Sequence, residues 1–562
     1  MPEPQPLASR IYVAVGGNEL PADVFSNLLE VTVDQQAHMP AMFTVRLADP
    51  GLQLLDNGPF DLTKEVKIEA AKEDGSKTLL IQGEVTALEP EFGEGMIAEL
   101  VVRGYDKSHR LFRETKSRAF LNKKDSDLAQ EMAQAAGLAA EVDSTATVYD
   151  HIYQHNQSDL AFLMQRAWRI GYECFVAGDK LYFRQPPRGD AEVTLHWGDD
   201  LQTFQPRMTL AEQVDEVIVK GWDVERQQPI VGRAQAADGR LYPRIQESRN
   251  GAEWAGQFGR GRLVIVNQPV VSQAEADALA AARLNELSGA FVEADGTAFR
   301  RPDIKAGQLV DLQALGQRLS GTYLVTSATH VVTPAGLTTH FSVRGARTGM
   351  LADQLRGGDA GISWPGVVTA VVTNVDDPQN WGRVKVKFPW MADDAESAWA
   401  RVMGIGAGPE AGWYVMPAVA DEVLVAFEQG DFDRPMVLGS LWNGQHAIPP
   451  EGASGGDQPL VRVWRSRGGH TLATFDNADN KVEIKSAGGH KVTLDDANKK
   501  LILTSGGGLT VTLDDNGRKI ILDSSGDIEI SAGGNLKLAA TMNMNLEANG
   551  QVTVKGAVIN LN

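Results

Sequence analysis

The chain has 562 residues, of which 43% are hydrophobic and 22% charged, a composition typical of a soluble globular protein with several domains. With 53 Lys and Arg against 73 Asp and Glu, the formal charge is −20, which argues against nucleic acid as a partner because a phosphate backbone needs a basic stripe. The single cysteine, Cys174, excludes an intrachain disulfide and a cysteine-based zinc site, and no signal peptide or long apolar segment is present, so we expect assembly in the cytoplasm.

Residues 1–355 are dominated by strand-like segments, with three helices at about 125–137, 158–171 and 272–287. The first helix begins with acidic residues and ends at Gly137, and the second begins at Ser158, as helix termini prefer. These features predict an α+β hub domain, followed by a glycine-rich linker at 356–363.

Residues 364–445 contain five short predicted strands, at 367–372, 382–388, 397–402, 422–427 and 435–439. Five strands without a helix of comparable size predict a small closed barrel of the OB type. Along the second strand, Val384, Val386 and Phe388 are expected to point inward, while the intervening basic residues face solvent or a neighbouring subunit. A second linker is expected at 446–459.

The last region, 460–562, is repetitive, and such repeats outrank other evidence about fold. Segments 488–496 and 507–515 match at a spacing of 19 residues. After Ser525 the apolar residues recur every eight positions, in units that we call octads, with a two-residue alternation inside each octad; they are Ile528, Ile530, Leu536, Leu538, Met544, Leu546, Val552 and Val554.

An eight-residue unit has about five residues in a strand of roughly 17 Å, and the rest form a turn. That is one side of a prism, whereas a β-helix needs three sides to enclose a core. Three chains, each giving one side, would bury the apolar residues on a common axis. The sequence therefore predicts a mainly β protein: a hub of β-barrel domains with helical insertions, an OB-fold barrel, and a C-terminal intertwined trimeric β-helix or β-prism.

Several motifs have both a functional and a structural interpretation. His151 and His155 are four residues apart, but no helix signal covers them and no metalloprotease glutamate follows His151, so a role at the surface or in contact with the barrel is favoured. The serine-elbow pattern at 452–456 lies between prolines and is interpreted as linker.

His470 and His490 occupy the same repeat position, where threefold symmetry could gather imidazoles around a metal or anion. Leu509 stands there in the next repeat, which favours packing. The acidic turns of the repeats resemble calcium ligands, but strand turns need Asp, Asn and Gly for their backbone alone.

The ordered set of barrel residues resembles the OB-fold signature of the VgrG spike family, which is similar to the fused hub and spike proteins of contractile phage baseplates. The hub resembles it too, at 43–46, 156–160 and 169–172. The barrel residues that carry the resemblance are Gly382, Arg383, Val384, Val386, Phe388, Pro389, Trp390, Asp421, Glu422, Gly430, Asp433, Arg434 and Pro435.

This resemblance implies a homotrimeric, membrane-puncturing spike on the inner tube of a contractile injection system, of unspecified host. Its partners would be inner-tube and baseplate proteins, a PAAR-repeat tip protein, effector cargo and, transiently on firing, the target membrane. The blunt end of the prism would bind the tip protein through Val558, Ile559, Asn560, Leu561 and Asn562.

Enzymatic members of the family carry extra domains, which find no room here: only a short linker separates Gly444 from Leu460, and the chain stops soon after Val554. We expect no catalytic residues, cofactor or metal. The alternative is a carbohydrate-binding or depolymerising trimeric β-helix tail protein. It is disfavoured because Phe475 is the sole aromatic residue after Trp464.

Overall fold

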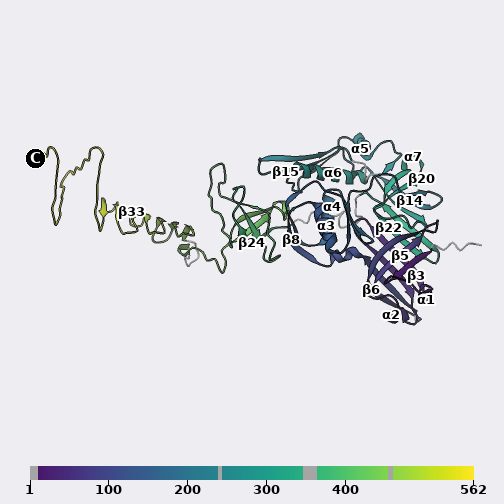
Figure 1. The fold of residues 1–562 in the computed structure, drawn as a ribbon. Coiled ribbons are helices and arrows are strands. Elements are labelled where there is room, and N and C mark those ends of the chain that lie inside the picture. The colour runs from purple at the N-terminus through teal and green to yellow at the C-terminus, as the bar shows by residue number, and fades with distance from the viewer. Residues whose placement is uncertain (1–9, 96, 238–242, 346–363, 453–459, 562) are drawn as a thin grey trace, which may run out of the picture. The chain divides into compact units, whose positions relative to one another are not determined.

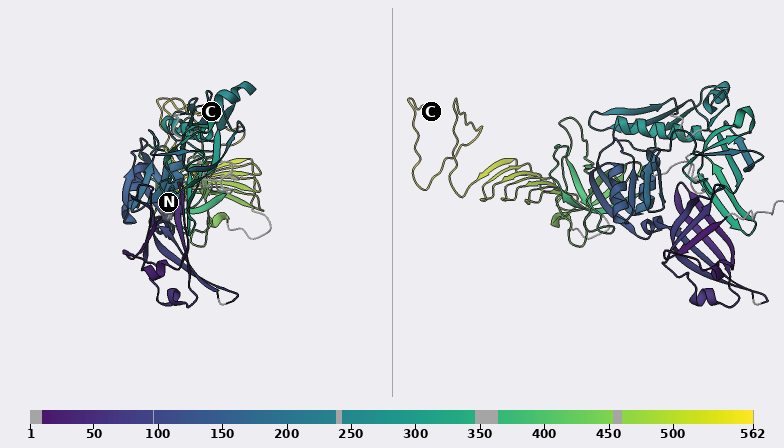
Figure 2. Two further views of the ribbon diagram at one scale, coloured as in Figure 1. Left: turned by 90° about the vertical axis from the view of Figure 1, so that its right-hand side faces the viewer. Right: turned by 45° about the vertical axis from the view of Figure 1, so that its right-hand side comes forward.

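The structure is a computed structural model that describes residues 10–561, except residues 96, 238–242, 346–363 and 453–459. The linker expected at 356–363 and most of the 452–456 motif therefore lie outside the described residues. The chain divides into two compact units, Met1–Leu441 and Trp442–Asn562, which are described separately (Figures 1 and 2).

The first unit is built on an eleven-stranded sheet of the order β14-β19-β23-β22-β3-β4-β7-β6-β5-β1-β2. Alternating burial along β4, with Phe43, Val45 and Leu47 all fully buried, explains why these segments form strands with one face on a core. Its strands are β1 (Ile11–Val15), β2 (Asn18–Glu19), β3 (Leu28–Gln36), β4 (Met39–Ala48), β5 (Glu65–Ala71), β6 (Lys77–Gly93), β7 (Ile97–Asp106), β14 (Leu201–Met208), β19 (Val292–Phe299), β22 (Ser327–Thr333) and β23 (Gly336–Val343).

Strands β1 to β7 of this sheet are followed in sequence by two helices and two small sheets. Helices α3 (Asp125–Ala135) and α4 (Asp159–Arg169) begin where the sequence predicts, and the Ser158 hydroxyl accepts a hydrogen bond from the Ala161 amide at the start of α4. They pack with β8 (Thr115–Lys123), β9 (Ala139–Val142), β10 (Tyr149–Ser158), β11 (Glu173–Ala177) and β12 (Lys180–Arg184).

Two further sheets complete the hub. One contains β13 (Val193–His196), β17 (Arg244–Ile245), β20 (Leu309–Gln313) and β21 (Gly321–Leu324). The other contains β15 (Glu216–Asp223), β16 (Gln228–Ala234) and β18 (Arg262–Ile265), against which α6 (Gln273–Gly289) packs closely. A Cβ on Gly232 would lie 2.3 Å from the Ala276 carbonyl, so only glycine permits this approach.

The short helical segments were not predicted from the sequence, because one turn leaves no periodicity to detect. They are α1 (Ala22–Phe25), α2 (Gln53–Asn57), α5 (Gly251–Ala255), α7 (Gly316–Leu319), η1 (Lys107–Phe112), η2 (Gly256–Phe258), η3 (Glu428–Gly430) and η4 (Pro450–Gly452).

A small closed barrel ends the first unit. Its strands are β24 (Val367–Asn374), β25 (Arg383–Lys387), β26 (Ala400–Val402), β27 (Glu422–Phe427) and β28 (Pro435–Ser440), joined in the order β24-β25-β26-β28-β27. The prediction of a five-stranded closed barrel is confirmed.

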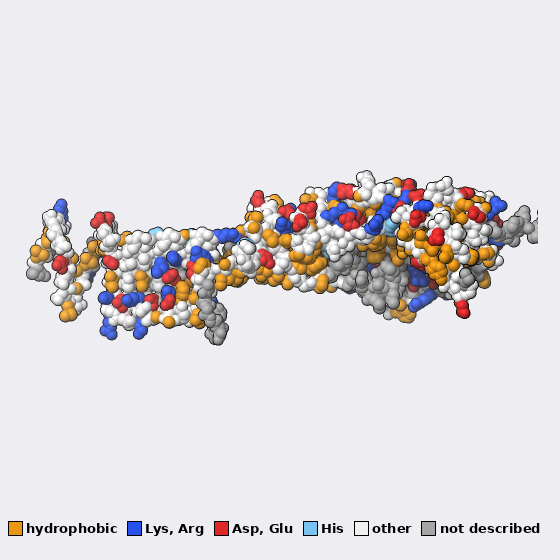
Figure 3. Space-filling model, turned by 90° about the horizontal axis from the view of Figure 1, so that it is seen from below, with side chains coloured by type: hydrophobic (Ala, Val, Ile, Leu, Met, Phe, Trp, Pro, Cys, Tyr) orange, Lys and Arg blue, Asp and Glu red, His pale blue; other side chains and the backbone are white. Residues whose placement is uncertain are grey.

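The second unit is a series of antiparallel strands paired in sequence order: β29 (Val461–Arg465), β30 (Thr471–Phe475), β31 (Lys481–Lys485), β32 (Lys491–Asp495), β33 (Lys500–Thr504), β34 (Thr510–Asp514) and β35 (Lys519–Asp523). The same turn recurs between strands of this series, with Gly469, Gly489 and Gly508 all at φ near +90°, a conformation that favours glycine. Beyond Asp523 the described residues form no strand, and Figure 3 shows hydrophobic side chains exposed there.

Candidate functional site

The inward-facing residues of β25 form the centre of the barrel core. Val384, Val386 and Phe388 are all 0% exposed. Between them, Arg383, Lys385 and Lys387 are half-buried, with the Lys385 ammonium 5.5 Å from the centre of the Trp399 ring. This alternation places the apolar members of the motif in a structural role.

Asp377, which the sequence analysis missed, fixes the turn that leads into β25. Its carboxylate accepts backbone hydrogen bonds from Gln379, Trp381 and Arg383, and forms two more with the Arg383 guanidinium at 2.6 and 3.0 Å. The Arg383 contact holds the pKa of Asp377 well below its usual range. The signal in the sequence was an aspartate six residues before Arg383, followed by Gly382, two residue types that are typical of turns. In the structure Gly382 has φ +71°.

The other motif residues lie at turns and strand boundaries. Trp390 donates from its indole nitrogen to the Thr369 carbonyl at 2.8 Å, and Asp421 accepts from the Ala418 amide. Gly430 has φ +79°, a conformation that disfavours other residues. Pro389 is exposed after β25, Glu422 begins β27 and Pro435 begins β28.

Strand β10 of the hub lies against the barrel. The Tyr153 amide donates to Asp433 Oδ1 at 2.6 Å, and His151 Nε2 lies 2.9 Å from the Glu396 carbonyl oxygen. The His155 ring stacks on Phe432, with 4.9 Å between ring centres. Of the two roles left open for His151 and His155, surface or barrel contact, the structure shows barrel contact.

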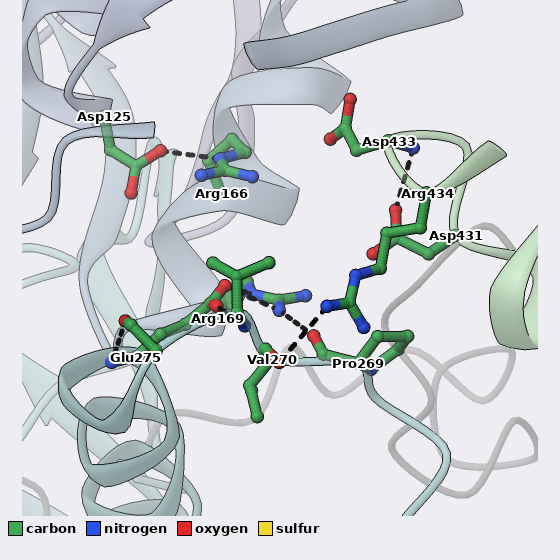
Figure 4. Close-up of polar contacts among 11 residues, drawn as sticks. Asp125, Arg166, Arg169, Pro269, Val270, Glu275, Asp431, Asp433 and Arg434 are labelled. Carbon is green, nitrogen blue, oxygen red and sulfur yellow. Dashed lines mark hydrogen bonds and ion pairs between the residues drawn. The ribbon is translucent and has the colours of Figure 1, made fainter. Parts of the chain in front are cut away.

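Paired charges surround this hub–barrel joint (Figure 4). On α4, Arg166 binds Asp125 at 2.6 Å, and Arg169 binds Glu275 of α6 at 2.8 Å. The Arg434 guanidinium reaches from the barrel to the carbonyl of Val270, at 3.4 Å. The hub and the barrel are thus connected by hydrogen bonds between side chains and backbone as well as by aromatic packing.

Two neighbouring carboxylates in this joint influence each other. Asp431 Oδ1 accepts a hydrogen bond from the Asp433 amide at 3.1 Å. Burial, reinforced by the negative charge of Asp433, raises the pKa of Asp431 to about 6.

No cluster of three or more His, Cys, Asp or Glu residues that could hold a metal ion occurs in the described part of the chain. Burial raises the pKa of the Cys174 thiol to about 12, so this thiol is not an activated nucleophile. Among the residues that the structure describes, none of the helices is both long and apolar enough to cross a membrane.

The predicted prism residues form a periodic row of exposed apolar side chains in the second unit. Each has between 52% and 71% of its surface exposed in the single chain, with Leu546 the most exposed. The predicted tip residues are also exposed, at 78% for Val558, 50% for Ile559 and 90% for Leu561. Asn560 is exposed as well, and Asn562 lies outside the described residues.

His470 and His490 link successive turns of the repeat. His470 Nδ1 accepts a hydrogen bond from the Ala487 amide at 3.3 Å, and His490 Nδ1 accepts one from the Gly506 amide at 3.1 Å. A ring nitrogen that accepts an N–H bond carries no proton, so the neutral ring has its proton on Nε2. This arrangement favours packing over the metal alternative, because the remaining nitrogen is a donor.

The carboxylates in the acidic turns of the repeat accept hydrogen bonds from groups of the same turn. Asp495 accepts hydrogen bonds from the amide and side chain of Asn498, and Asp514 accepts one from the Gly517 amide. These contacts are those expected of tight turns rather than of calcium ligands.

Comparison with known protein families shows which family this chain belongs to. A family model described as the Alg8 N-terminal domain matches residues 8–334, more than half of the chain. A second, described as the type VI secretion system/phage-baseplate injector OB domain, matches residues 368–442, which contain the closed barrel. The chain belongs to the VgrG-type spike family of contractile injection systems. Neither matching model describes an enzymatic domain.

Curated VgrG relatives match parts of the chain. The type VI secretion system spike protein VgrG1a of Pseudomonas aeruginosa is 34% identical over 119 residues, 20% of this chain and 18% of that protein. VgrG3 of Vibrio cholerae is 29% identical over 203 residues, 33% of this chain and 20% of that protein. The matches thus span only a small part of either VgrG relative.

Among solved structures, the half-lidded PdpA-VgrG complex of Francisella contains a chain that is similar in fold. The similarity covers 92% of this chain and 88% of that one, with a TM-score of 0.50 and 9% identity. At this identity the likeness concerns the fold alone.

Proposed function

We propose that three copies of this VgrG-type chain form a non-enzymatic puncturing spike at the tip of the inner tube of a contractile injection system. The hub would join the tube and baseplate proteins, the barrel at 364–445 would form a collar, and residues 460–562 would form the shared prism. Assembly would take place in the cytoplasm, and the spike would carry effector cargo and meet the target membrane on firing.

The observation that carries this proposal is the exposed row of apolar residues at 528–554. Eight apolar side chains recur with a period of eight, and each is more than half exposed in the single chain. Leaving such a row in water is costly, at about 25 cal/mol per Å² of apolar surface. Two further copies would cover it, and the interchain pairing would resist force along the axis.

The barrel supplies a second surface that an assembly would cover. The loop between β26 and β27 exposes Met403, Ile405, Trp413, Tyr414 and Val415, all at 56% or more. Exposed apolar groups of this kind, gathered on one loop, are typical of protein interfaces.

Light scattering on the full chain and on a chain ending at Gly455 tests the proposal. We expect a mass near three times 60.7 kDa for the full chain, and loss or weakening of the trimer on truncation. A full-length chain that stays monomeric at micromolar concentration would contradict it. Robust depolymerisation of polysaccharide by the trimer would favour the carbohydrate-active alternative.

The tip would bind a PAAR-type protein through residues 552–562, whose apolar side chains are exposed. A chain ending at Gln551 should keep its trimeric mass and lose co-purification with a PAAR-repeat protein. Equal binding by both chains would place the tip partner elsewhere.

A further inference from the structure

The three-stranded sheet of β15, β16 and β18 is covered by a helix on one face and has several exposed side chains on the other. Helix α6 packs on the inner face, where Val217, Val219 and Ile265 are buried against it. Figures 1 and 2 show α6 on one side of the sheet that contains β15. Side chains that alternate with the buried ones point to the opposite face, where Ile218 is 4% exposed and Val264 and Trp222 are 44% and 46% exposed.

One end of this outer face holds three arginines around a single carboxylate. Arg233, Arg260 and Arg262 each approach Glu216 at 3.0 Å. The Glu216 side chain is 1% exposed, whereas the three arginines are 43% to 62% exposed. A guanidinium has five N–H donors, so each arginine keeps donors that point away from Glu216.

Neighbouring groups fix these arginines in place. Gln235 donates to Glu216 Oε1 at 3.0 Å, and Asp215 holds the Gly261 amide at 2.7 Å, between Arg260 and Arg262. Hydrogen bonding from Gln235, followed by that from Arg233, lowers the pKa of Glu216, which keeps it ionised. Ordering the donors in advance reduces the entropy cost of binding a second anion.

The rest of the outer face carries mostly apolar side chains, of which Ile218 is buried and the others are exposed. Val264 is paired with Ile218 and is 44% exposed, Val266 is 54% exposed and Trp222 is 46% exposed. Lys220 adds a further positive charge between Ile218 and Trp222. Four cations against the carboxylates of Glu216 and Asp215 stand out in a chain whose net charge is −20.

Strand β18 is also the edge of its sheet, so it offers unpaired backbone groups to an added strand. Within β18 the outer side chains are those of Arg262 and Val264, and the same alternation continues to Arg260 before the strand and Val266 after it. A strand added beside β18 would place its own side chains directly opposite these four. The complementary pattern is two acidic residues and two apolar residues, all at alternate positions.

We propose that β18 and the outer face of its sheet bind an extended acidic segment of another protein, which pairs as a strand with two carboxylates on the arginine cluster and two apolar side chains on the valines. If the arginines served only to prevent unwanted pairing at the edge strand β18, exposed valines and a tryptophan beside them would not be needed. The arginine cluster and the apolar patch together define a ligand.

The test uses the full chain and a short fluorescent peptide with glutamate at two alternate positions and valine at the next two, made in both orders. We expect micromolar binding that weakens as salt is raised. The double substitution Arg260→Ala/Arg262→Ala should weaken it by about tenfold or more. Val264→Glu, which leaves the contacts of Glu216 intact, should do the same by repulsion.

Two matched controls keep the test decisive. Val148→Glu adds the same charge at a position that is 53% exposed outside this sheet, and should leave peptide affinity unchanged. A peptide with lysine in place of glutamate should not bind. Failure of the acidic peptide to bind, or equal affinity for the Val264→Glu variant, would overturn the proposal.

A second copy of this chain is the competing occupant. If Arg260→Glu/Arg262→Glu changes the mass of the protein in light scattering, the face lies between copies and the proposal is wrong. An unchanged mass together with lost peptide binding supports it, and neither result depends on whether the octads form a trimeric prism.

Discussion

At the residue scale, the Asp377 carboxylate accepts five hydrogen bonds, two of them from the guanidinium of the motif residue Arg383. The Asp377 side chain is 4% exposed, so Arg383→Ala would leave a buried carboxylate without its charged partner. We expect a loss of about 2 kcal/mol in barrel stability. Faster hydrogen exchange of the β25 amides, measured by mass spectrometry, would report it.

Arg401→Ala is the matched control for this substitution. Arg401 is exposed on β26, and its side chain contacts the Met436 sulfur at 3.6 Å rather than a carboxylate. Its removal should change barrel stability by less than about 0.5 kcal/mol. Equal effects of the two substitutions would refute the role given to Asp377.

A single buried histidine makes the stability of the hub sensitive to pH. His330 is 0% exposed, its Nδ1 lies 2.9 Å from the Thr339 hydroxyl, and burial lowers its pKa to about 4. Because the unfolded chain binds a proton near pH 6.5 and the folded chain does not, the contribution of His330 is present above pH 6.5. It is lost as the pH falls towards 4.

Buried acids act in the opposite direction and must be separated from this effect. Burial raises the pKa of Glu173 to about 7, so its neutral form favours the folded state at low pH. We therefore predict the difference between wild type and His330→Gln, which should shift by about 3 kcal/mol between pH 6.5 and 4. Denaturant unfolding at several pH values measures it, and a difference independent of pH would contradict the assignment.

At the element scale, β10 and the barrel depend on one aromatic side chain. Phe432 is 3% exposed and lies 4.4 Å from Phe427, 4.9 Å from His155 and 5.0 Å from Tyr153, between ring centres. Phe432→Ala removes packing on both sides of the joint, and should cost about 3–5 kcal/mol.

Calorimetry of the full chain checks this prediction, with Phe258→Ala as its control. Phe258 is 85% exposed, so its truncation should leave the transition in place. A barrel transition that is unaffected by Phe432→Ala would mean that the joint contributes little to stability.

At the scale of the whole molecule, the octads should control assembly. Leu538→Asp would place three buried charges, one from each chain, at one level of the predicted trimer axis. This should shift the light-scattering mass from trimer towards monomer. Lys537→Glu, on the neighbouring outward position, should leave the mass unchanged. Trimers of equal stability in both variants would exclude Leu538 from a shared core.

The sequence by itself determined the elements whose signal is local. Helices α3, α4 and α6 have caps and several turns of periodicity, the barrel strands have alternating apolar residues, and the repeats at 468–515 have turn glycines 20 and 19 residues apart. Each of these depends on residues that are near one another in the chain, so that pattern and propensity suffice.

Only the tertiary structure decided which distant segments meet. It paired β3 with β22, placed His155 on Phe432, closed Asp377 around Arg383 and gathered three arginines on Glu216. Such contacts depend on sheet order and on which face of a strand is covered, neither of which leaves a local signal. For the octads the sequence predicts a shared core, because an exposed row of that period can be buried only by other chains.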